Sequence, residues 1–465
     1  MQTKNFFVVV LAGAALSWAI GYAAEPPASF TVGVGAHFAE GGGVLPVNLS
    51  VIREAGITSI RGGMRWQFVE TQKGRYAIPE TFDAMIDQAV AAGLQPLPIL
   101  GGNVPFFDNN SDRPHSPEAL EDLAKYCEFM ARRFKGKVRM YELFNEWDAP
   151  SRQTETPGAV DAYVNVLKAV YPRMKAVDPS IVILGGALTS KAPGSGWLES
   201  FLRAGALQYL DAVSIHTYRN QGAAFPQRGA EGWASAMQRI DELVRKYSGA
   251  RQVPIYVTEM GWTTELNRGT RPGLAAAYLA RMYLLARTLP FLKGIWWYDF
   301  EDDGWGATQR EHNFGLVHAD LTPKPAYYAM AGIANFVSTA EYLGRIETAD
   351  PDIWALKFRR PDGKDAWAIW SAHEDDYWQV TLRSSQANPA PVSVSQVGRA
   401  AFQHLWGTRE RGPDAPVIPN QMTVLVGEMP WLVVGDLSAV RLTGVERREF
   451  PELTRPPKGP GGDQH

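Results

Sequence analysis

The sequence predicts a parallel (β/α)8 barrel followed by a small antiparallel β domain, and two observations lead to this fold class. Between residues 31 and 336, short β-branched runs bounded by Gly, Pro or Asp alternate eight times with amphipathic helical patterns, as βαβ units around a parallel sheet do. After about residue 337 the helical patterns stop, and short alternating runs separated by turn residues replace them.

Eight segments carry the strand pattern of the predicted barrel, which spans residues 28–336. The expected strands are residues 31–38, 58–66, 95–102, 138–146, 181–188, 212–218, 254–262 and 294–300. Helical patterns separate them at residues 79–92, 117–134, 157–177, 197–204, 230–246, 272–289 and after Pro323, and a weak one lies at residues 47–55. Eight βα units in roughly 310 residues fit a TIM barrel, which takes about 250 residues before insertions. A doubly wound open sheet is the rival arrangement, but no glycine-rich phosphate-binding loop follows any predicted strand.

The C-terminal part reads as a small antiparallel β-sandwich over residues 340–447. Its alternating runs are residues 352–360, 365–372, 376–384, 391–397, 421–427 and 429–436. Turn residues such as Pro361 and Gly363 separate the runs. The tail, residues 448–465, is rich in Pro and Gly and has little to bury, so we expect it to be disordered.

The composition is that of an ordinary globular protein and argues against nucleic acid as a partner. The chain has 465 residues, of which 45% are hydrophobic and 20% charged, which is enough for a large core in two domains. Its net charge is −3, with 46 Lys and Arg against 49 Asp and Glu. A protein that binds a phosphate backbone needs a basic excess that this chain lacks.

The first 24 residues have the pattern of a secretory signal peptide. Lys4 supplies a positive start, residues 6–20 are mostly apolar, and the small residues Gly21, Ala23 and Ala24 suit cleavage. An uncleaved membrane anchor is the alternative, because the apolar run approaches the roughly 18 residues of a spanning helix. No later segment is long and apolar enough to span a membrane. We expect an exported protein, in the bacterial periplasm or secreted, without a membrane span after signal removal.

Polar side chains gather where the predicted barrel strands end. In a parallel barrel the loops after the strands form the mouth, where active sites lie, while packed side chains fill the interior. Polar or aromatic residues within or just after the predicted strands include His37, Arg61, Asn103, Asn145, Glu146, His216, Tyr218, Glu259 and Trp297. Strands far apart in the sequence therefore bring candidate site residues to one mouth.

Two glutamates dominate this set. Glu146 and Glu259 each end an otherwise apolar strand, and they are three βα units apart, so they face each other across the barrel. One carboxyl with a raised pKa beside one that stays ionised is the pair that cleavage of a glycosidic bond requires. A purely structural buried salt bridge is the alternative, but two neighbouring glutamates without an assured cation would be costly.

The chain resembles clan A retaining glycoside hydrolases, whose (β/α)8 barrels carry glutamates on strands four and seven. The resemblance rests on "FNE" at residues 144–146, "HTY" at 216–218, "TEMGW" at 258–262 and "WWYDF" at 296–300. The "ELFNE" context and the C-terminal β domain are similar to family 39, which includes β-xylosidases, iduronidases and bacterial exopolysaccharide hydrolases. The chain departs from that pattern in having Asp148 after the acid/base where a proline is frequent, and its "EMGW" is more like family 5.

The resemblance implies a double-displacement reaction that retains anomeric configuration. Glu146 would be the general acid/base and Glu259 the nucleophile, and Asn145 would donate a hydrogen bond to the sugar 2-hydroxyl. A retaining pair of carboxyls lies about 5 to 5.5 Å apart, whereas an inverting pair needs roughly 6.5 to 9.5 Å.

The resemblance also implies supporting roles around the nucleophile. His216 and Tyr218 would keep Glu259 ionised and oriented, and Arg61 would add positive charge beneath it. Trp297 would form the floor of the subsite next to the scissile bond. Arg61 as a structural ion-pair partner is the alternative to its role in the site.

The remaining candidates would contact the substrate. Trp147 and Trp262 adjoin the two glutamates, and we expect them as cleft walls because sugar rings stack on aromatic faces. Asn103 and His37 complete the set, although His37 is equally suited to be a hydrogen-bonded core histidine. Several aromatic residues at one mouth favour an extended chain as substrate, and hence endo action.

No cofactor and no metal are expected. The acidic loop "DFEDDGWG", residues 299–306, could bind a cation or a basic sugar, but it lacks the D-x-D-x-D-G pattern of a calcium loop. No H-E-x-x-H motif and no paired Cys and His motif occur in the sequence. A solvated loop is therefore the expectation for this segment.

The sequence predicts a retaining glycoside hydrolase that acts within a bacterial exopolysaccharide or a related polysaccharide. The expected partner is the polysaccharide or oligosaccharide substrate, with exopolysaccharide export machinery as a candidate protein partner. Two alternatives stay open. The same barrel could be a non-catalytic polysaccharide-binding or export-scaffold protein, or it could be a transglycosidase in which a sugar hydroxyl replaces water.

Overall fold

The computed structural model describes residues 30–38, 45–103, 106–150, 158–219, 227–386, 389–399 and 420–448. The predicted signal segment, residues 1–24, and nearly all of the predicted tail lie outside the described residues. Among the described residues, no helix combines the length and the apolar character needed to cross a membrane.

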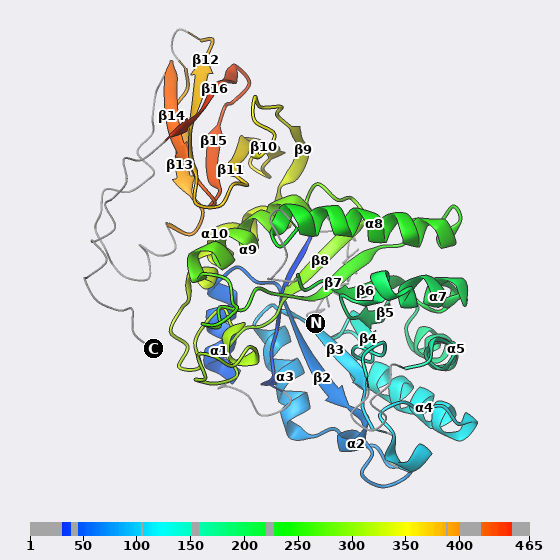
Figure 1. Cartoon of the computed structure of the whole chain (residues 1–465). Helices are drawn as coiled ribbons and strands as arrows, with labels where there is room; N and C mark the ends of the chain where they lie inside the picture. Colours follow the sequence, from blue (N-terminus) through cyan, green and yellow to red (C-terminus); the bar gives the residue numbers. More distant parts are fainter. Residues whose placement is uncertain are drawn as a thin grey trace, which may run out of the picture.

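Eight parallel strands form a closed barrel in sequence order, and β8 pairs back with β1 (Figure 1). The barrel strands are β1 (Thr31–Gly35), β2 (Ser59–Arg65), β3 (Gln95–Gly101), β4 (Met140–Leu143), β5 (Val182–Leu188), β6 (Ala212–His216), β7 (Ile255–Met260) and β8 (Leu292–Trp297). The predicted fold class is confirmed, and the open doubly wound sheet is excluded because the sheet has no edge strand.

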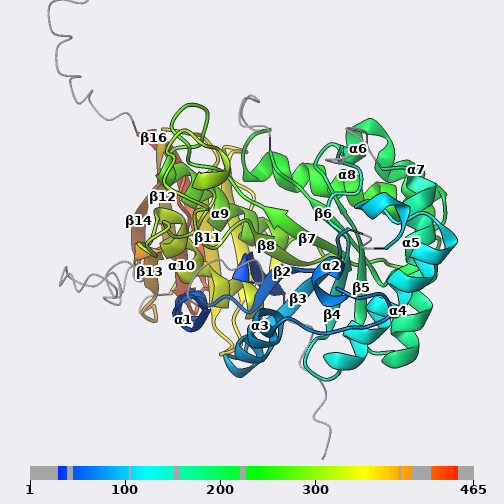
Figure 2. The ribbon, with the colours of Figure 1, turned by 90° about the horizontal axis from the view of Figure 1, so that it is seen from below.

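Helices surround the barrel, as Figure 2 shows from below. They are α1 (Leu45–Glu54), α2 (Trp66–Val69), α3 (Glu80–Ala91), α4 (Pro117–Arg133), α5 (Val160–Val177), α6 (Ala192–Ser195), α7 (Trp197–Arg203), α8 (Ala230–Ser248), α9 (Pro272–Ala286) and α10 (Pro325–Thr339). Short 3-10 turns lie at η2 (Asp108–Asn110), η3 (Ala206–Tyr209) and η4 (Glu311–Asn313). The connection with the weak helical pattern is a helix, α1.

Helix α4 shows how local sequence sets these elements. Ser116 caps its start by accepting a hydrogen bond from the Ala119 backbone N–H, and Pro117 occupies the first turn, where its missing N–H costs nothing. Arg132 and Arg133 in the last turn complement the negative end of the helix dipole. Cys127 lies on the buried face, where it packs as a core thiol.

The C-terminal domain consists of two antiparallel sheets that follow α10. One sheet has the strand order β13-β15-β11-β10-β9 and the other β14-β12-β16. The strands are β9 (Glu341–Arg345), β10 (Ile353–Arg359), β11 (Asp365–Ser371), β12 (Tyr377–Ser384), β13 (Ser393–Gln396), β14 (Gln421–Val426), β15 (Trp431–Gly435) and β16 (Val440–Arg448). The sequence runs did not include β9 and β16, neither of which contains a fully buried residue to mark a hydrophobic face.

The two domains share one hydrophobic core. In Figure 1 the β domain rests on α8, α9 and α10, and from Leu274 to Ala286 every residue of α9 is buried. Buried polar contacts cross the interface: the Trp370 indole donates to Glu231 Oε1 at 2.9 Å, and Glu231 in turn pairs with Arg281. Phe358 packs edge-on against Phe336 of α10 at a centroid distance of 5.2 Å. The interface is therefore part of the core rather than a loose contact.

We predict that Trp370→Ala lowers the free energy of unfolding by about 3–5 kcal/mol, because it removes a fully buried indole and leaves Glu231 Oε1 with one hydrogen bond fewer. Trp305→Ala is the matched control, since its side chain is 73% exposed and should change stability by less than about 0.5 kcal/mol. Denaturant unfolding measures both, and equal small effects would contradict a shared core.

Candidate active site

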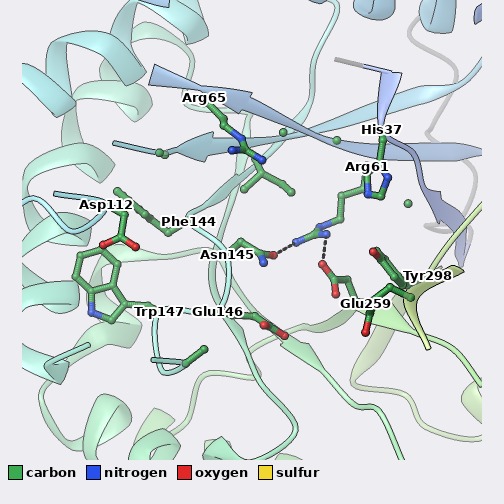
Figure 3. Close-up of a pocket in the computed structure, with 18 of the residues that line it drawn as sticks. His37, Arg61, Arg65, Asp112, Phe144, Asn145, Glu146, Trp147, Glu259 and Tyr298 are labelled. Atoms are coloured by element: carbon green, nitrogen blue, oxygen red, sulfur yellow. Dashed lines mark hydrogen bonds and ion pairs between the residues drawn. The ribbon is translucent and has the colours of Figure 1, made fainter. Parts of the chain in front are cut away.

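A cleft of about 720 Å³ opens at the carboxyl ends of the barrel strands (Figure 3). The residues that line it come from every barrel strand except β5, or from the loop that follows the strand. Glu146 lies near the middle of the view in Figure 3, with Asp112 and Trp147 to one side and Glu259, His37 and Tyr298 to the other. The cleft therefore extends past the two glutamates in both directions.

Glu146 stands just beyond β4, in a backbone conformation that few non-glycine residues adopt. The strand ends at Leu143, and both Phe144 (φ 63°) and Glu146 (φ 49°) are in the left-handed region. The Glu146 backbone N–H donates to the carbonyl of Ala187, itself at φ 44°, at 2.9 Å. Left-handed residues of this kind cost free energy and concentrate at functional sites, so the tip of β4 is shaped to aim Glu146 into the cleft.

Asp148 fastens this tip to the end of β5. Its carboxylate accepts hydrogen bonds from the backbone N–H of Thr189 at 2.8 Å and from the Thr189 hydroxyl at 2.5 Å. The residue that departs from the family pattern therefore cross-links the loop after Glu146 to the neighbouring strand.

Arg61 is the central charge of the site. The guanidinium donates to Glu142 at 2.6 Å, to Glu259 at 2.7 Å and to Asn145 at 2.7 Å, and the last two bonds are drawn in Figure 3. The side chain is only 4% exposed. Burial opposes a charged guanidinium, but the carboxylates of Glu142 and Glu259 outweigh it and raise the pKa of Arg61.

Glu259 is held as an anion. Its Oε1 accepts from Arg61, and its Oε2 accepts from the Tyr218 hydroxyl at 2.9 Å. Burial acts to raise the pKa of Glu259, but the charges of His216 and Arg61 and the hydrogen bonds hold it below its ordinary value. Burial and the neighbouring carboxylate raise the pKa of Tyr218, so the phenol keeps its proton and acts as a donor.

His216 connects the two glutamates from within the barrel wall. It is fully buried, and its Nδ1 lies 2.9 Å from Glu146 Oε1 and 3.4 Å from Glu259 Oε2. Burial disfavours an imidazolium, but Glu259 and Glu146 raise the pKa of His216. One ligand atom from each of these three residues lies within 4.8 Å of the others. The glutamates are therefore close enough for the short spacing of a retaining pair and closer than an inverting pair requires.

The two carboxylates differ in their surroundings. The Glu259 side chain is 12% exposed and accepts hydrogen bonds from the Arg61 guanidinium and the Tyr218 phenol. The Glu146 side chain is 32% exposed and lines the cleft. Such asymmetry is what separates the roles of two carboxyl groups in one site.

Two of the predicted substrate contacts lie elsewhere. Trp297, expected as the floor, is 1% exposed and donates to the Phe314 carbonyl at 3.1 Å. Trp262, expected as a wall, is also 1% exposed, donates to the Arg228 carbonyl and packs 5.1 Å from Tyr278. Neither indole is among the residues that line the cleft, because each finds a buried acceptor for its N–H; Tyr298 lines the cleft instead.

The other predicted contacts do border the cleft. Trp147 lines it, although the indole is 2% exposed and packs 4.9 Å from Phe144. Asn103 also lines it, and its side chain donates to the Asn110 carbonyl at 3.0 Å. His37 lines the cleft on the other side of Glu146 from Trp147 (Figure 3), and its Nδ1 lies 3.0 Å from Asp303 Oδ1.

Sequence reasoning missed Glu142, the buried partner of Arg61. It is fully buried, and its Oε1 has no hydrogen-bond partner in the described chain. Its position in "YELFNE" held the signal: Glu142 is the carboxylate inside the apolar strand and not the one at its tip. Charged cleft residues on loops, such as Asp112, Arg113 and Arg310, carried no such strand pattern.

Three groups of side chains in the described residues could each offer three ligand atoms to a metal ion. They are Glu146, His216 and Glu259; His37, Asp299 and Asp303; and Asp350, Asp352 and His373. In the first group, Arg61, Tyr218 and His216 already contact the carboxylate oxygens, which leaves fewer of those oxygens open to a metal ion.

Comparison with protein families identifies the chain. The model for glycosyl hydrolases family 39 matches residues 72–373, which is more than half of the sequence. The chain belongs to glycosyl hydrolase family 39. This family 39 protein is therefore a retaining O-glycosyl hydrolase, and its resemblance to clan A is confirmed. A comparison with curated proteins returns no match.

Solved structures share the fold of this family 39 protein. A family 39 glycoside hydrolase from Bacteroides cellulosilyticus WH2 has a TM-score of 0.69 at 24% identity, covering 87% of this chain and 80% of the other. A monomeric β-xylosidase from Caulobacter crescentus CB15 has a TM-score of 0.57 at 16% identity, covering 88% and 96%. A GH5_18 protein from Streptomyces cattleya has a TM-score of 0.52 at 16% identity, covering 66% and 80%.

We predict that Arg61→Met lowers the free energy of unfolding by about 3–5 kcal/mol, because it leaves Glu142 and Glu259 buried without their shared cation. Arg65→Met, on the same strand but exposed, is the control and should change stability by no more than about 0.5 kcal/mol. Urea unfolding of both variants tests this, and a stable Arg61→Met protein would mean that the carboxylates take up protons at no cost.

Proposed function

We propose that this protein cleaves internal glycosidic bonds of a polysaccharide by double displacement, with Glu146 as general acid/base and Glu259 as nucleophile. The observation that carries the proposal is the pair itself: two glutamates with oxygens within 4.8 Å, one held as an anion by Arg61 and Tyr218 and the other open to the cleft. This is the arrangement that retaining cleavage needs.

In the first step, a carboxylate oxygen of Glu259 attacks the anomeric carbon as the bond to the leaving oxygen breaks. Glu146 gives its proton to that oxygen, so the leaving sugar departs as a neutral alcohol. In the second step, Glu146 takes a proton from water, and the water oxygen displaces Glu259. Each step inverts the anomeric carbon, so the product has the original configuration.

The surrounding residues support these roles by keeping charge in place. Arg61 and Tyr218 stabilise the Glu259 carboxylate that leaves in the second step, and neither has to move for this. Asn145 Oδ1 accepts from Arg61, which turns its amide N–H2 away from the guanidinium and leaves it as the donor toward a sugar hydroxyl. His216 Nδ1 lies against Glu146 Oε1 and orients the acid/base.

The shape of the cleft supports a polymeric substrate and endo action. Lining residues continue from Asp112 and Trp147 on one side of the glutamates to His37 and Tyr298 on the other (Figure 3). A site that binds one terminal sugar is closed at one end, whereas a chain cut internally needs room on both sides of the scissile bond. An exopolysaccharide or related polymer meets this requirement.

Export is part of the proposal. The apolar run at residues 6–20 supports secretion to the bacterial periplasm or beyond, and the sole cysteine, Cys127, is buried, so the fold relies on packing and not on disulfides. Contact with exopolysaccharide export machinery would follow from that location.

Azide rescue tests the two roles. We expect Glu259→Ala and Glu146→Ala each to lower kcat/KM on aryl glycosides and polysaccharides by at least about 10³-fold. Azide should restore turnover, giving an inverted glycosyl azide with Glu259→Ala and a retained one with Glu146→Ala. Glu347→Ala, an exposed residue of the β domain, is the control. A wild type that binds oligosaccharides but cleaves none would point to a binding scaffold, and cleavage of short aryl xylosides alone would contradict endo action.

The pH profile tests the environment of Glu259. Its pKa lies below the ordinary value, so the nucleophile stays ionised as pH falls through the usual carboxyl range, and activity is lost only at lower pH. Tyr218→Phe removes a donor to the anion, so the acidic limb of kcat/KM should move up by about one pH unit. Tyr256→Phe is the control: Tyr256 lies on β7, the strand that carries Glu259, and its change should leave the acidic limb in place. A downward shift would contradict the assignment.

A further inference from the structure

A second pocket, of about 330 Å³, adjoins the catalytic cleft. The two share Ala36 and His37, so they form one continuous depression at the β1 end of the cleft. The acidic loop after β8 forms most of its wall, including Asp299, Glu301 and Asp303. None of these three carboxyl groups has a part in the reaction proposed above.

The charge of this pocket is negative. The buried Lys324 neutralises Asp302, with its Nζ 2.8 Å from Asp302 Oδ1. His318 Nδ1 lies 3.2 Å from Asp302 Oδ2. Glu301 accepts from Asn48 at 2.9 Å, and Asp303 lies 3.0 Å from His37. In the part of the chain that the structure describes, no Lys or Arg forms an ion pair with Asp299, Glu301 or Asp303.

Asp299 is the buried member of this group, and its surroundings are evidence that the pocket binds a ligand. The residue is 2% exposed, it lines the pocket, and its Oδ1 has no hydrogen-bond partner among the described residues. Buried polar oxygens are nearly always hydrogen-bonded, so an unpartnered one calls for a donor. Burial, together with the charges of Asp303 and Asp302, raises the pKa of Asp299, and a cation placed there would relieve that repulsion.

We propose that this pocket is a subsite for a sugar residue that carries a free ammonium group, an amino sugar without an acetyl group, in the polysaccharide bound by the cleft. The inference rests on the proposed function, because it needs a sugar chain in the cleft. Oligosaccharides with neutral or acetylated sugars at this position bind more weakly.

Three observations favour a sugar over a bare metal ion. The pocket is of the size that encloses a small molecule and is much larger than an ion needs. It continues directly from the cleft, so a chain that crosses Glu259 runs into it. Trp305 lines it with a side chain that is 73% exposed, which offers an aromatic face for the sugar ring to stack on.

The chemistry of an ammonium group matches the acceptors present. An ammonium has three N–H donors and no acceptor, and carboxylates are its strongest hydrogen-bond partners. Glu301 and Asp303 provide charge at the pocket, and Asp299 Oδ1 provides an acceptor without a partner. Acetylation removes the positive charge and adds a carbonyl acceptor, which the carboxylates would repel.

Calorimetric titration of the full chain tests the proposal, with Glu146→Gln present in every sample to prevent turnover. The probes are β-1,4-linked glucosamine oligosaccharides and the same oligosaccharides fully N-acetylated. We expect the glucosamine probe to bind more tightly, and the pair Glu301→Gln and Asp303→Asn to weaken its binding about tenfold. The pair Glu347→Gln and Asp362→Asn, exposed in the β domain, makes the same change in net charge and should leave binding unchanged.

Several outcomes overturn the proposal. These are absence of binding, equal binding of the two probes, or no effect of the Glu301 and Asp303 changes. If Ca²⁺, added as calcium chloride, binds tightly and Asp303→Asn abolishes that binding, the pocket is a metal site instead. Asp303→Asn alone serves if the double variant fails to fold. Successful azide rescue with equal binding of the probes would defeat only this inference, whereas charge-dependent binding without hydrolysis would defeat only the catalytic proposal.

Discussion

The site depends on one buried cation. Arg61 brings a single positive charge to two carboxylates and an amide that come from β4, the loop after it and β7. Without it, the barrel would hold Glu142 and Glu259 close together in a dry interior, where their repulsion is poorly screened. With it, Glu259 remains an anion and Asn145 has a fixed orientation. Strand β2, which contains no catalytic carboxylate, therefore sets the electrostatics of the reaction.

The shape of the β4 tip adds direction to that charge. In a regular strand, side chains alternate between the two faces of the barrel wall. In β4 this regular geometry ends at Leu143. Left-handed backbone at Phe144 and Glu146, the hydrogen bond to Ala187 and the clamp from Asp148 to Thr189 carry the acid/base candidate over the cleft. Rigid packing and backbone strain thus cooperate: neighbouring strands hold a conformation that the chain would not adopt alone.

The barrel and the two glutamates could be predicted because short stretches of the sequence specify them. A carboxylate after an apolar run marks Glu146 and Glu259, and eight repeats of strand and helix mark the barrel. The burial of Trp262 and Trp297 could not be read in the same way, since it depends on carbonyl acceptors at Arg228 and Phe314 that only the folded chain brings near. The link from Arg61 to Glu142 joins residues 81 positions apart, and no local pattern specifies it.

The contacts that join the β domain to the barrel bear on how such domains can be exchanged. Glu374 of the β domain pairs with Arg228 and also accepts a hydrogen bond from Tyr278, and the Arg228 carbonyl holds the indole of Trp262, three residues after Glu259. A chimera that joined this barrel to another accessory domain would need to reproduce the carboxylate of Glu374 and the indole of Trp370. Recombination at the boundary after α10 would otherwise disturb the strand that carries the nucleophile, so barrel and β domain are expected to be inherited as one unit.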